Sequence, residues 1–134
     1  MDSPLKAYKR TDGRWGLRNH VLILPLHSAL STTARKIADE VKGCVALNHD
    51  WSGEDGSDLA RITKTLAGSA ANPNNHSVIF LTLGTPVELE IIKQAKALTR
   101  QTIIEVSLPK AGSISNLSEE ATKHAKELAT QANF

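Results

Sequence analysis

The sequence predicts an α/β fold: a doubly wound sheet of about four parallel strands with helices on both faces. Two observations support this prediction. Short runs that are apolar along their whole length alternate with longer stretches whose apolar residues recur at helical spacing. Fully apolar strands are typical of parallel sheets covered on both faces, because antiparallel sheets with one wet face alternate apolar and polar residues instead. Rossmann-like and flavodoxin-like folds have this pattern.

The first half of the chain predicts two strand–helix units after a polar arm of residues 1–20. Val21–Leu26 is an apolar run without polar interruption, so we expect it to be a central strand. Ser31–Val41 then reads as a helix, and Cys44–Leu47 as a second short strand. The second helix should begin near Ser57 or Asp58, either of which can cap it. Its apolar face is formed by Leu59, Ile62, Leu66 and Ala70.

The second half repeats the alternation. Val78–Leu83 and Thr102–Ser107 are the third and fourth expected strands, and Val87–Leu98 and Leu117–Ala132 are the third and fourth expected helices. The whole order is βαβαβαβα. We therefore expect a single α/β domain over residues 21–134.

Composition limits the classes of protein that need to be considered. A chain of 134 residues that is 40% hydrophobic can bury one core without disulfides, and the single cysteine, Cys44, excludes an internal disulfide framework. The N-terminus has no apolar core of a signal peptide, and no apolar run approaches the ~20 residues that span a bilayer. A net charge of +2 is too small to indicate nucleic acid. We expect a cytoplasmic protein without a membrane or nucleic-acid partner.

Polar residues gather where the expected strands end. Ligands of doubly wound sheets bind outside the carboxyl ends of the strands, and these ends bring four polar groups to one edge. They are His27-Ser28, Asn48-His49-Asp50, Gly84-Thr85 and the segment 109–113. Two interpretations stay open. In the first, His27 and His49 face one another and one of them acts as a general base. In the second, these residues are ordinary solvent-exposed loop residues and helix caps.

The segment ALNHDWSGEDG, residues 46–56, adds a candidate metal site. His49, Asp50, Glu54 and Asp55 supply one nitrogen and three carboxylates within seven residues, a set compatible with Fe, Mn or Mg. Their spacing matches no closed structural zinc site. The alternative is that acidic residues before a helix simply complement its dipole.

Several familiar motifs are absent from the sequence. No GxGxxG follows the first strand and no GxxxxGK[ST] occurs, so we expect no nucleotide cofactor. Ser28 lacks a GxSxG context, which argues against a hydrolase nucleophile. The arm concentrates cations, and Arg14 and Arg18 could offer their guanidinium forks to a carboxylate. The alternative for both is a solvated arm residue.

A family resemblance rests on four stretches. YKRTDGRWGLRNH, residues 8–20, with the run to Pro25, is similar to the "GYxRxDGRxGxRNxxxxxP" opening of the central domain of the altronate and galactarate dehydratase family, which includes the large subunit of sulfolactate sulfo-lyase. Residues 45–49 resemble "VALxH". Residues 65–68 with 72–74 resemble "RTLAGxxxHPN", and residues 83–88 stand where the family has "GLGCE". The resemblance thus covers nearly the whole chain.

The resemblance implies a metal-dependent lyase, with iron or manganese as the metal. In this family a base removes the proton next to a carboxylate while the metal helps a hydroxyl leave. We assign His27 and His49 to catalysis. We assign substrate binding to Arg14, Arg18, Asn19, Ser28, Gly84 and Thr85. His27-Ser28, the residues after His49, and Thr85 stand where the family has cysteines, so the family's own chemistry is in doubt here.

Two hypotheses about function follow. In the first, the chain is a sugar-acid dehydratase-like domain, a carbon–oxygen lyase subunit or fragment that binds a small hydroxy-carboxylate. It would then work with a second chain that carries the family's carboxyl-terminal domain, and a homo-oligomer is compatible with this. In the second, the chain is a non-catalytic binding or assembly module that kept the fold and lost the cysteines.

Overall fold

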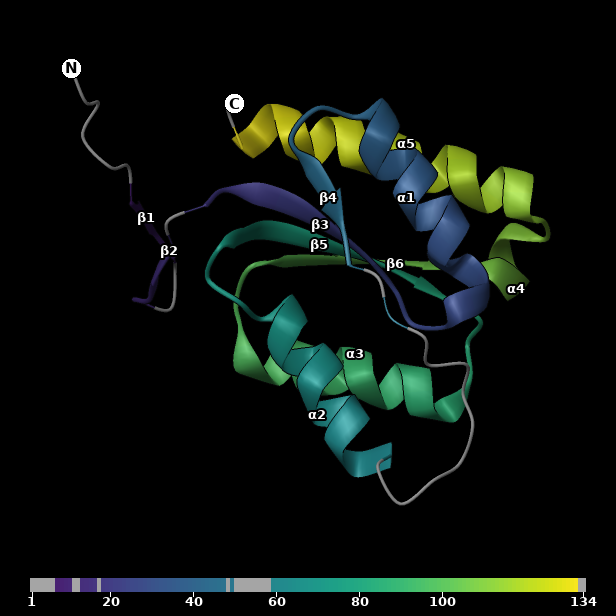
Figure 1. Cartoon of the computed structure of the whole chain (residues 1–134), viewed down its shortest axis with the longest axis horizontal. Helices are drawn as coiled ribbons and strands as arrows, with labels where there is room; N and C mark the ends of the chain where they lie inside the picture. Colours follow the sequence, from purple (N-terminus) through teal and green to yellow (C-terminus); the bar gives the residue numbers. More distant parts are fainter. Residues whose placement is uncertain (1–6, 11–12, 17, 48, 50–58, 133–134) are drawn as a thin grey trace.

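A computed structural model describes residues 7–10, 13–16, 18–47, 49 and 59–132. Its main sheet has four strands, all parallel, in the order β4-β3-β5-β6 (Figure 1). The strands are β3 (His20–Pro25), β4 (Cys44–Ala46), β5 (Asn75–Thr82) and β6 (Thr102–Ser107). β3 pairs with β4 on one side and β5 on the other. The predicted parallel sheet with residues 21–26 at an inner position is confirmed.

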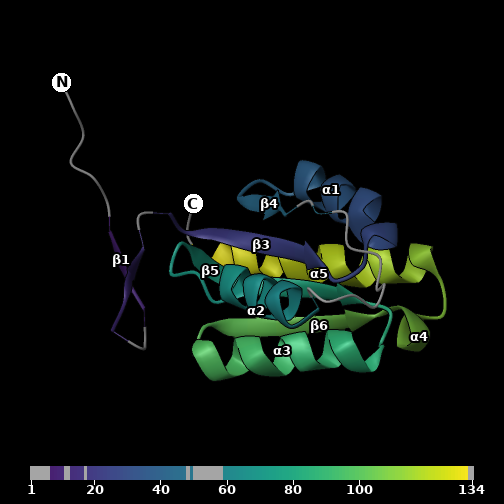
Figure 2. The same cartoon turned by 60° about the horizontal axis from the view of Figure 1, so that its bottom comes forward.

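Helices cover both faces of this sheet (Figures 1 and 2). On one face lie α1 (Ser31–Glu40) and α5 (Ile114–Ala132), and on the other lie α2 (Leu59–Ala70) and α3 (Pro86–Leu98). Successive residues of the inner strands alternate between the two cores: Ile23 and Ile79 pack toward α1 and α5, whereas Leu24 and Phe80 pack toward α2 and α3. The doubly wound α/β prediction is therefore confirmed, and its apolar strands are explained by burial on both sides.

Several local elements differ from the predicted ones. β5 begins at Asn75, three residues before the expected Val78, because its first polar residues are buried and satisfied: the Asn75 amide donates to the carbonyl oxygens of Ser69 and Ala70. A short helix, α4 (Leu108–Ala111), stands where we expected a loop, started by Pro109 and ended by Gly112 at φ +86°. A 3₁₀ turn, η1 (Ser28–Leu30), precedes α1. The expected caps of α2, Ser57 and Asp58, lie outside the described residues.

The polar arm forms a small antiparallel hairpin that was not predicted, with β1 (Tyr8–Lys9) paired to β2 (Trp15–Gly16). Gly13, at φ +89°, turns the chain between them. The hairpin lies beside the amino ends of the main strands (Figures 1 and 2). Gly16 packs so closely on the Pro73 carbonyl group that a Cβ atom there would clash with it. None of the described helices is long and apolar enough to cross a lipid bilayer.

Candidate functional site

The strand order singles out the carboxyl ends of β3 and β5. The chain runs from β3 outward to β4 and then returns across β3 to reach β5, so the strand order reverses between β3 and β5. In open α/β sheets, ligands bind at such a reversal point. His27 and Ser28 follow β3 after one residue, and Gly84 and Thr85 follow β5 after one residue. These four predicted residues therefore flank the position at which this fold accepts a ligand.

His27 holds the first turn after β3. It is the residue that caps η1, and its Nδ1 accepts the backbone N–H of Ala29 at 3.0 Å. An amide N–H can only donate, so Nδ1 must carry the lone pair of the ring. The neutral imidazole then bears its proton on Nε2. His27 is thus a capping residue that also presents a hydrogen-bond donor.

His49 is tied to the same strand end through its other nitrogen. Its Nε2 lies 2.5 Å from the carbonyl oxygen of Pro25, the last residue of β3. A carbonyl oxygen can only accept, so Nε2 carries the proton and the lone pair of the neutral ring lies on Nδ1. Two half-buried histidines are therefore anchored within two residues of Pro25, one as a hydrogen-bond donor and the other as a potential proton acceptor.

The turn after β5 is organised by Glu88, a residue that we did not assign to the site from the sequence. Its side chain is 1% exposed. Its carboxylate accepts hydrogen bonds from the Thr82 hydroxyl at 2.9 Å, the Leu83 amide at 2.8 Å and the Thr85 hydroxyl at 2.5 Å. Thr85 in turn caps α3 by accepting from the Glu88 amide. The signal for this arrangement was present in the sequence, as Thr-x-x-Glu with Pro86 at the first helical position.

Gly84 lets this turn lie against the end of β6. It adopts φ +81°, a conformation that favours glycine, and its amide donates to the Thr82 hydroxyl. A Cβ atom built on it would lie 3.5 Å from the Pro109 ring. The backbone of residues 83–85 is therefore fixed from both sides, by Glu88 and by the start of α4.

Three predicted substrate-binding residues lie at the opposite edge of the sheet. Arg14, Arg18 and Asn19 precede β3, whose six residues span about 20 Å. The Arg14 guanidinium donates to Gln101 just before β6, and the Asn19 amide donates to the carbonyl oxygen of Ala132 at 2.8 Å. Arg18 is exposed. Within one chain, the structure does not bring these three residues together with His27 and His49.

The amino edge also holds two histidines whose pKa values are lowered. Burial lowers the pKa of His20, with Arg18 and Arg10 acting in the same direction against the opposing hydrogen bond to Asn75. Burial and Arg10 lower the pKa of His76. In β4, burial raises the pKa of Cys44 to about 11, so this thiol is protonated near neutral pH. Cys44 packs, partly buried, against the core on the α1 and α5 face, and a protonated thiol is a poor nucleophile.

The predicted metal site depends on a segment that the structure does not describe. Asp50, Glu54 and Asp55 lie outside the described residues, and His49 is the one member of the set that lies within them. In the described part of the chain, no three His, Cys, Asp or Glu side chains are grouped as metal ligands. The Nε2 of His49 is already engaged by Pro25. The metal site stays a prediction, and no chemical step below is routed through it.

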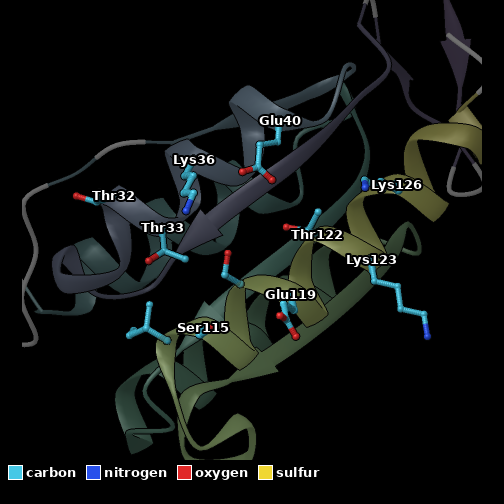
Figure 3. Close-up of a pocket in the computed structure, with 11 residues that line it drawn as sticks. Thr32, Thr33, Lys36, Glu40, Ser115, Glu119, Thr122, Lys123 and Lys126 are labelled. Carbon is cyan, nitrogen blue, oxygen red and sulfur yellow. The ribbon is translucent and has the colours of Figure 1, made fainter.

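A groove of about 750 Å³ lies away from these residues, between α1 and α5 (Figure 3). Its walls carry hydroxyl groups and charged side chains of both signs, among them Lys36 and Glu40 from α1 and Glu119 and Lys123 from α5. None of the predicted site residues lines it. The large groove and the predicted site residues thus lie in different places. We place the candidate site at the predicted residues, because an open polar groove between two surface helices needs no ligand to explain it.

Comparison with known proteins identifies the family. The family model described as "D-galactarate dehydratase/Altronate hydrolase, second domain" matches residues 7–133. The chain belongs to this family. A curated relative, the (2R)-sulfolactate sulfo-lyase subunit beta of Chromohalobacter salexigens, is 39% identical over 76 residues, which cover 56% of this chain and 20% of the relative. No solved structure matches. The resemblance seen in the sequence is confirmed, and the matched stretch spans about a fifth of the relative's length.

Proposed function

We propose that this chain is the hydroxy-carboxylate-binding domain of a sugar-acid lyase, with its site at the carboxyl ends of β3 and β5. Membership of the dehydratase second-domain family supports the reaction class. The observation on which the proposal rests is that His27 and His49 are anchored to one strand end through opposite ring nitrogens. This pairing supplies a hydrogen-bond donor and a base where the fold accepts a ligand.

The chemistry that these two histidines would perform is an elimination of water. The Nδ1 lone pair of His49 takes the proton from the carbon next to the substrate carboxylate. The electrons of that C–H bond form a carbon–carbon double bond, and the neighbouring C–O bond breaks. The departing hydroxyl group accepts a hydrogen bond from Nε2–H of His27, takes up the proton that His49 has gained, and leaves as water. Proton transfers of this kind each contribute roughly 10²- to 10⁴-fold in rate.

We further propose that the active enzyme needs more protein than this chain. The relative named as a subunit of a sulfo-lyase is about five times longer than the stretch matched here. A second chain with the remaining domains would cover the carboxyl ends of β3 and β5 and exclude water from the reacting atoms.

A second candidate function is a binding or assembly module without chemistry. One observation favours it: several polar side chains at this edge already form hydrogen bonds that hold the local structure. Nδ1 of His27 caps η1, and the Thr85 hydroxyl and the Glu88 carboxylate hold the turn before α3. A fold that has lost its catalytic role would keep just such capping contacts.

Two measurements test the proposal. Calorimetric titration of the protein with galactarate should show binding that His49→Ala and His27→Ala weaken and that His124→Gln, on the outer helix α5, leaves unchanged. Absence of binding to the wild type would overturn the proposal. Proton NMR in D₂O then separates the two candidates: exchange at the carbon next to the carboxylate, lost in His49→Ala, supports the lyase. Binding without exchange, also in the presence of the partner chain, supports the module.

A further inference from the structure

The carboxyl edge needs a cation if it is to hold a hydroxy-carboxylate. Removal of a proton next to a carboxylate builds negative charge on a group that is already an anion, so a nearby cation is required to stabilise it. The two arginines predicted for this task, Arg14 and Arg18, precede β3 and lie at its other end. The described residues around His49 offer a different arginine.

His49 shares a cavity of about 330 Å³ with four residues of α2, namely Arg61, Ile62, Thr65 and Leu66. This volume is at the lower end of the range for small-molecule sites, roughly 300 to 1,000 Å³. The lining is mostly apolar, and Leu66 belongs to the same buried cluster as Leu24 and Leu26 of the β3 region. The cavity therefore lies over the carboxyl end of β3, where His49 is anchored.

Arg61 is the cation on the wall of this cavity. Its side chain is exposed, and in the described part of the chain its guanidinium has no hydrogen-bond or ion-pair partner. Thr65 follows four residues later on the same face of α2, so a guanidinium fork and a hydroxyl group lie side by side. An arginine fork binds a carboxylate through two parallel hydrogen bonds, which also fixes the orientation of the acid.

We propose that Arg61 holds the substrate carboxylate beside His49; this rests on the function proposed above. The Thr65 hydroxyl then forms a hydrogen bond with a neighbouring hydroxyl group of the substrate. The apolar floor of Ile62 and Leu66 shields one side of the ion pair from water, which strengthens the pair. A carboxylate held by Arg61 turns its adjacent carbon toward His49, whose Nδ1 carries the lone pair. Arg61 is thus a substrate-binding residue that selects acids and positions the carbon to be deprotonated.

The test is a calorimetric titration with galactarate of the wild type and four variants. Arg61→Gln should weaken binding roughly 10- to 100-fold, the range expected for the loss of a charge-assisted pair. Arg61→Lys keeps the charge but loses the fork, so its affinity should lie between the two. Lys64→Ala is the matched control, because Lys64 is exposed on the same helix and does not line the cavity. Arg18→Ala reports on the amino edge. Circular dichroism confirms that each variant is folded.

Each outcome assigns the result to one of the two proposals. Weakened binding in Arg61→Gln, with Lys64→Ala and Arg18→Ala unchanged, supports the role of Arg61. Wild-type binding that both Arg61→Gln and Arg18→Ala leave intact overturns the role of Arg61 while the proposed function stands. Binding that Arg18→Ala weakens and Arg61→Gln does not would place the carboxylate at the arm and overturn both proposals. No binding by the wild type overturns both. The Arg61 Nε–H resonance, identified by its absence in Arg61→Gln, should also shift when galactarate is added.

Discussion

The two edges of the central sheet use their polar side chains for different purposes. At the amino edge, Arg10 donates to the carbonyl oxygens of Pro73 and Arg18 and to the Asn19 side chain, at 2.6, 2.9 and 2.8 Å. These bonds fasten the hairpin to the domain. At the carboxyl edge, His49 is fixed to Pro25 and faces a cavity that also contains Arg61. At the amino edge these side chains hold the chain together. At the carboxyl edge Glu88 does so as well, but His49 and Arg61 also line a cavity.

Because of this difference, the motif that carries the family resemblance and the residues proposed for the reaction lie at opposite edges. The family opening that made the resemblance specific contains Gly13, Gly16 and Asn19, and each has a structural task in the arm: a left-handed turn, a close approach to Pro73, and a bond to the end of α5. A specific motif can therefore mark how a domain is assembled. The residues for which we propose a reaction are fewer and lie some 20 Å away, at the far end of the six-residue strand β3.

The largest effect that we expect comes from Glu88→Ala at the carboxyl edge. The substitution leaves the Thr82 hydroxyl and the Leu83 amide without their acceptor, and each buried unsatisfied donor costs roughly 1 to 3 kcal/mol. Urea denaturation should show a loss of about 3 kcal/mol or more in the free energy of unfolding. Glu90→Ala is the control: Glu90 is exposed on the same helix and should change stability by less than about 0.5 kcal/mol. Equal losses in the two variants would show that the Glu88 network does not hold the turn.

A smaller effect is expected from Gly16→Ala at the amino edge. The added methyl group meets the backbone of Pro73, and overpacking of this kind costs about 1 to 3 kcal/mol. The arm should detach, so trypsin should cut after Lys9, Arg10, Arg14 or Arg18 faster than in the wild type. Galactarate binding at the carboxyl edge should not change, because the arm does not reach it. Gly68→Ala, at a helical position with nothing within 4 Å, should be neutral or stabilising. If loss of the arm also abolished binding, the two edges would not be independent.

The fold could be predicted from the sequence because it depends on long apolar runs. The strands expected at residues 21–26 and 102–107 agree with β3 and β6 to within one residue. The sequence reasoning failed where a polar residue is buried. Asn75 begins β5 because its amide is satisfied by α2, a contact that no local pattern reveals. Arg61 carries no signal in the sequence for a related reason: a single arginine on a helix has no distinguishing pattern, and only the packing of α2 makes it line a cavity with His49.

Acid should destabilise the domain through two histidines at the amino edge. Burial and nearby arginines lower the pKa values of His20 and His76 in the folded state, so the unfolded chain binds protons at a higher pH than the folded one. Stability that is fully present above the ordinary histidine pKa is then lost as the pH falls below it. Urea midpoints measured between about pH 7.5 and about pH 5 should decrease.

The variant His20→Gln links this acid sensitivity to the arm. Asn75 Oδ1 accepts from Nε2 of His20 at 2.9 Å, since the Asn75 amide nitrogen is already donating to Ser69 and Ala70. Glutamine can replace that donor without titrating. The fall in midpoint should therefore be smaller in His20→Gln than in the wild type, and His124→Gln should keep the full fall. A slope that His20→Gln does not change would place the acid sensitivity elsewhere.

The smallest expected effect concerns the predicted metal site. If His49 and the carboxylates of residues 50–55 bind a divalent cation weakly, Mn²⁺ at about ten times its dissociation constant should stabilise the folded state by about 1.4 kcal/mol. For a domain of this size that corresponds to a rise in Tm of roughly 3 to 6 °C. His49→Ala also removes the bond to Pro25 and so lowers the starting Tm, which is why the shift on adding metal, and not the Tm itself, is the quantity to compare. Gly16→Ala should show the full shift, because its defect lies at the other edge. A wild type without a shift, or a His49→Ala shift equal to that of the wild type, would remove the metal from this edge and leave the two histidines to act without it.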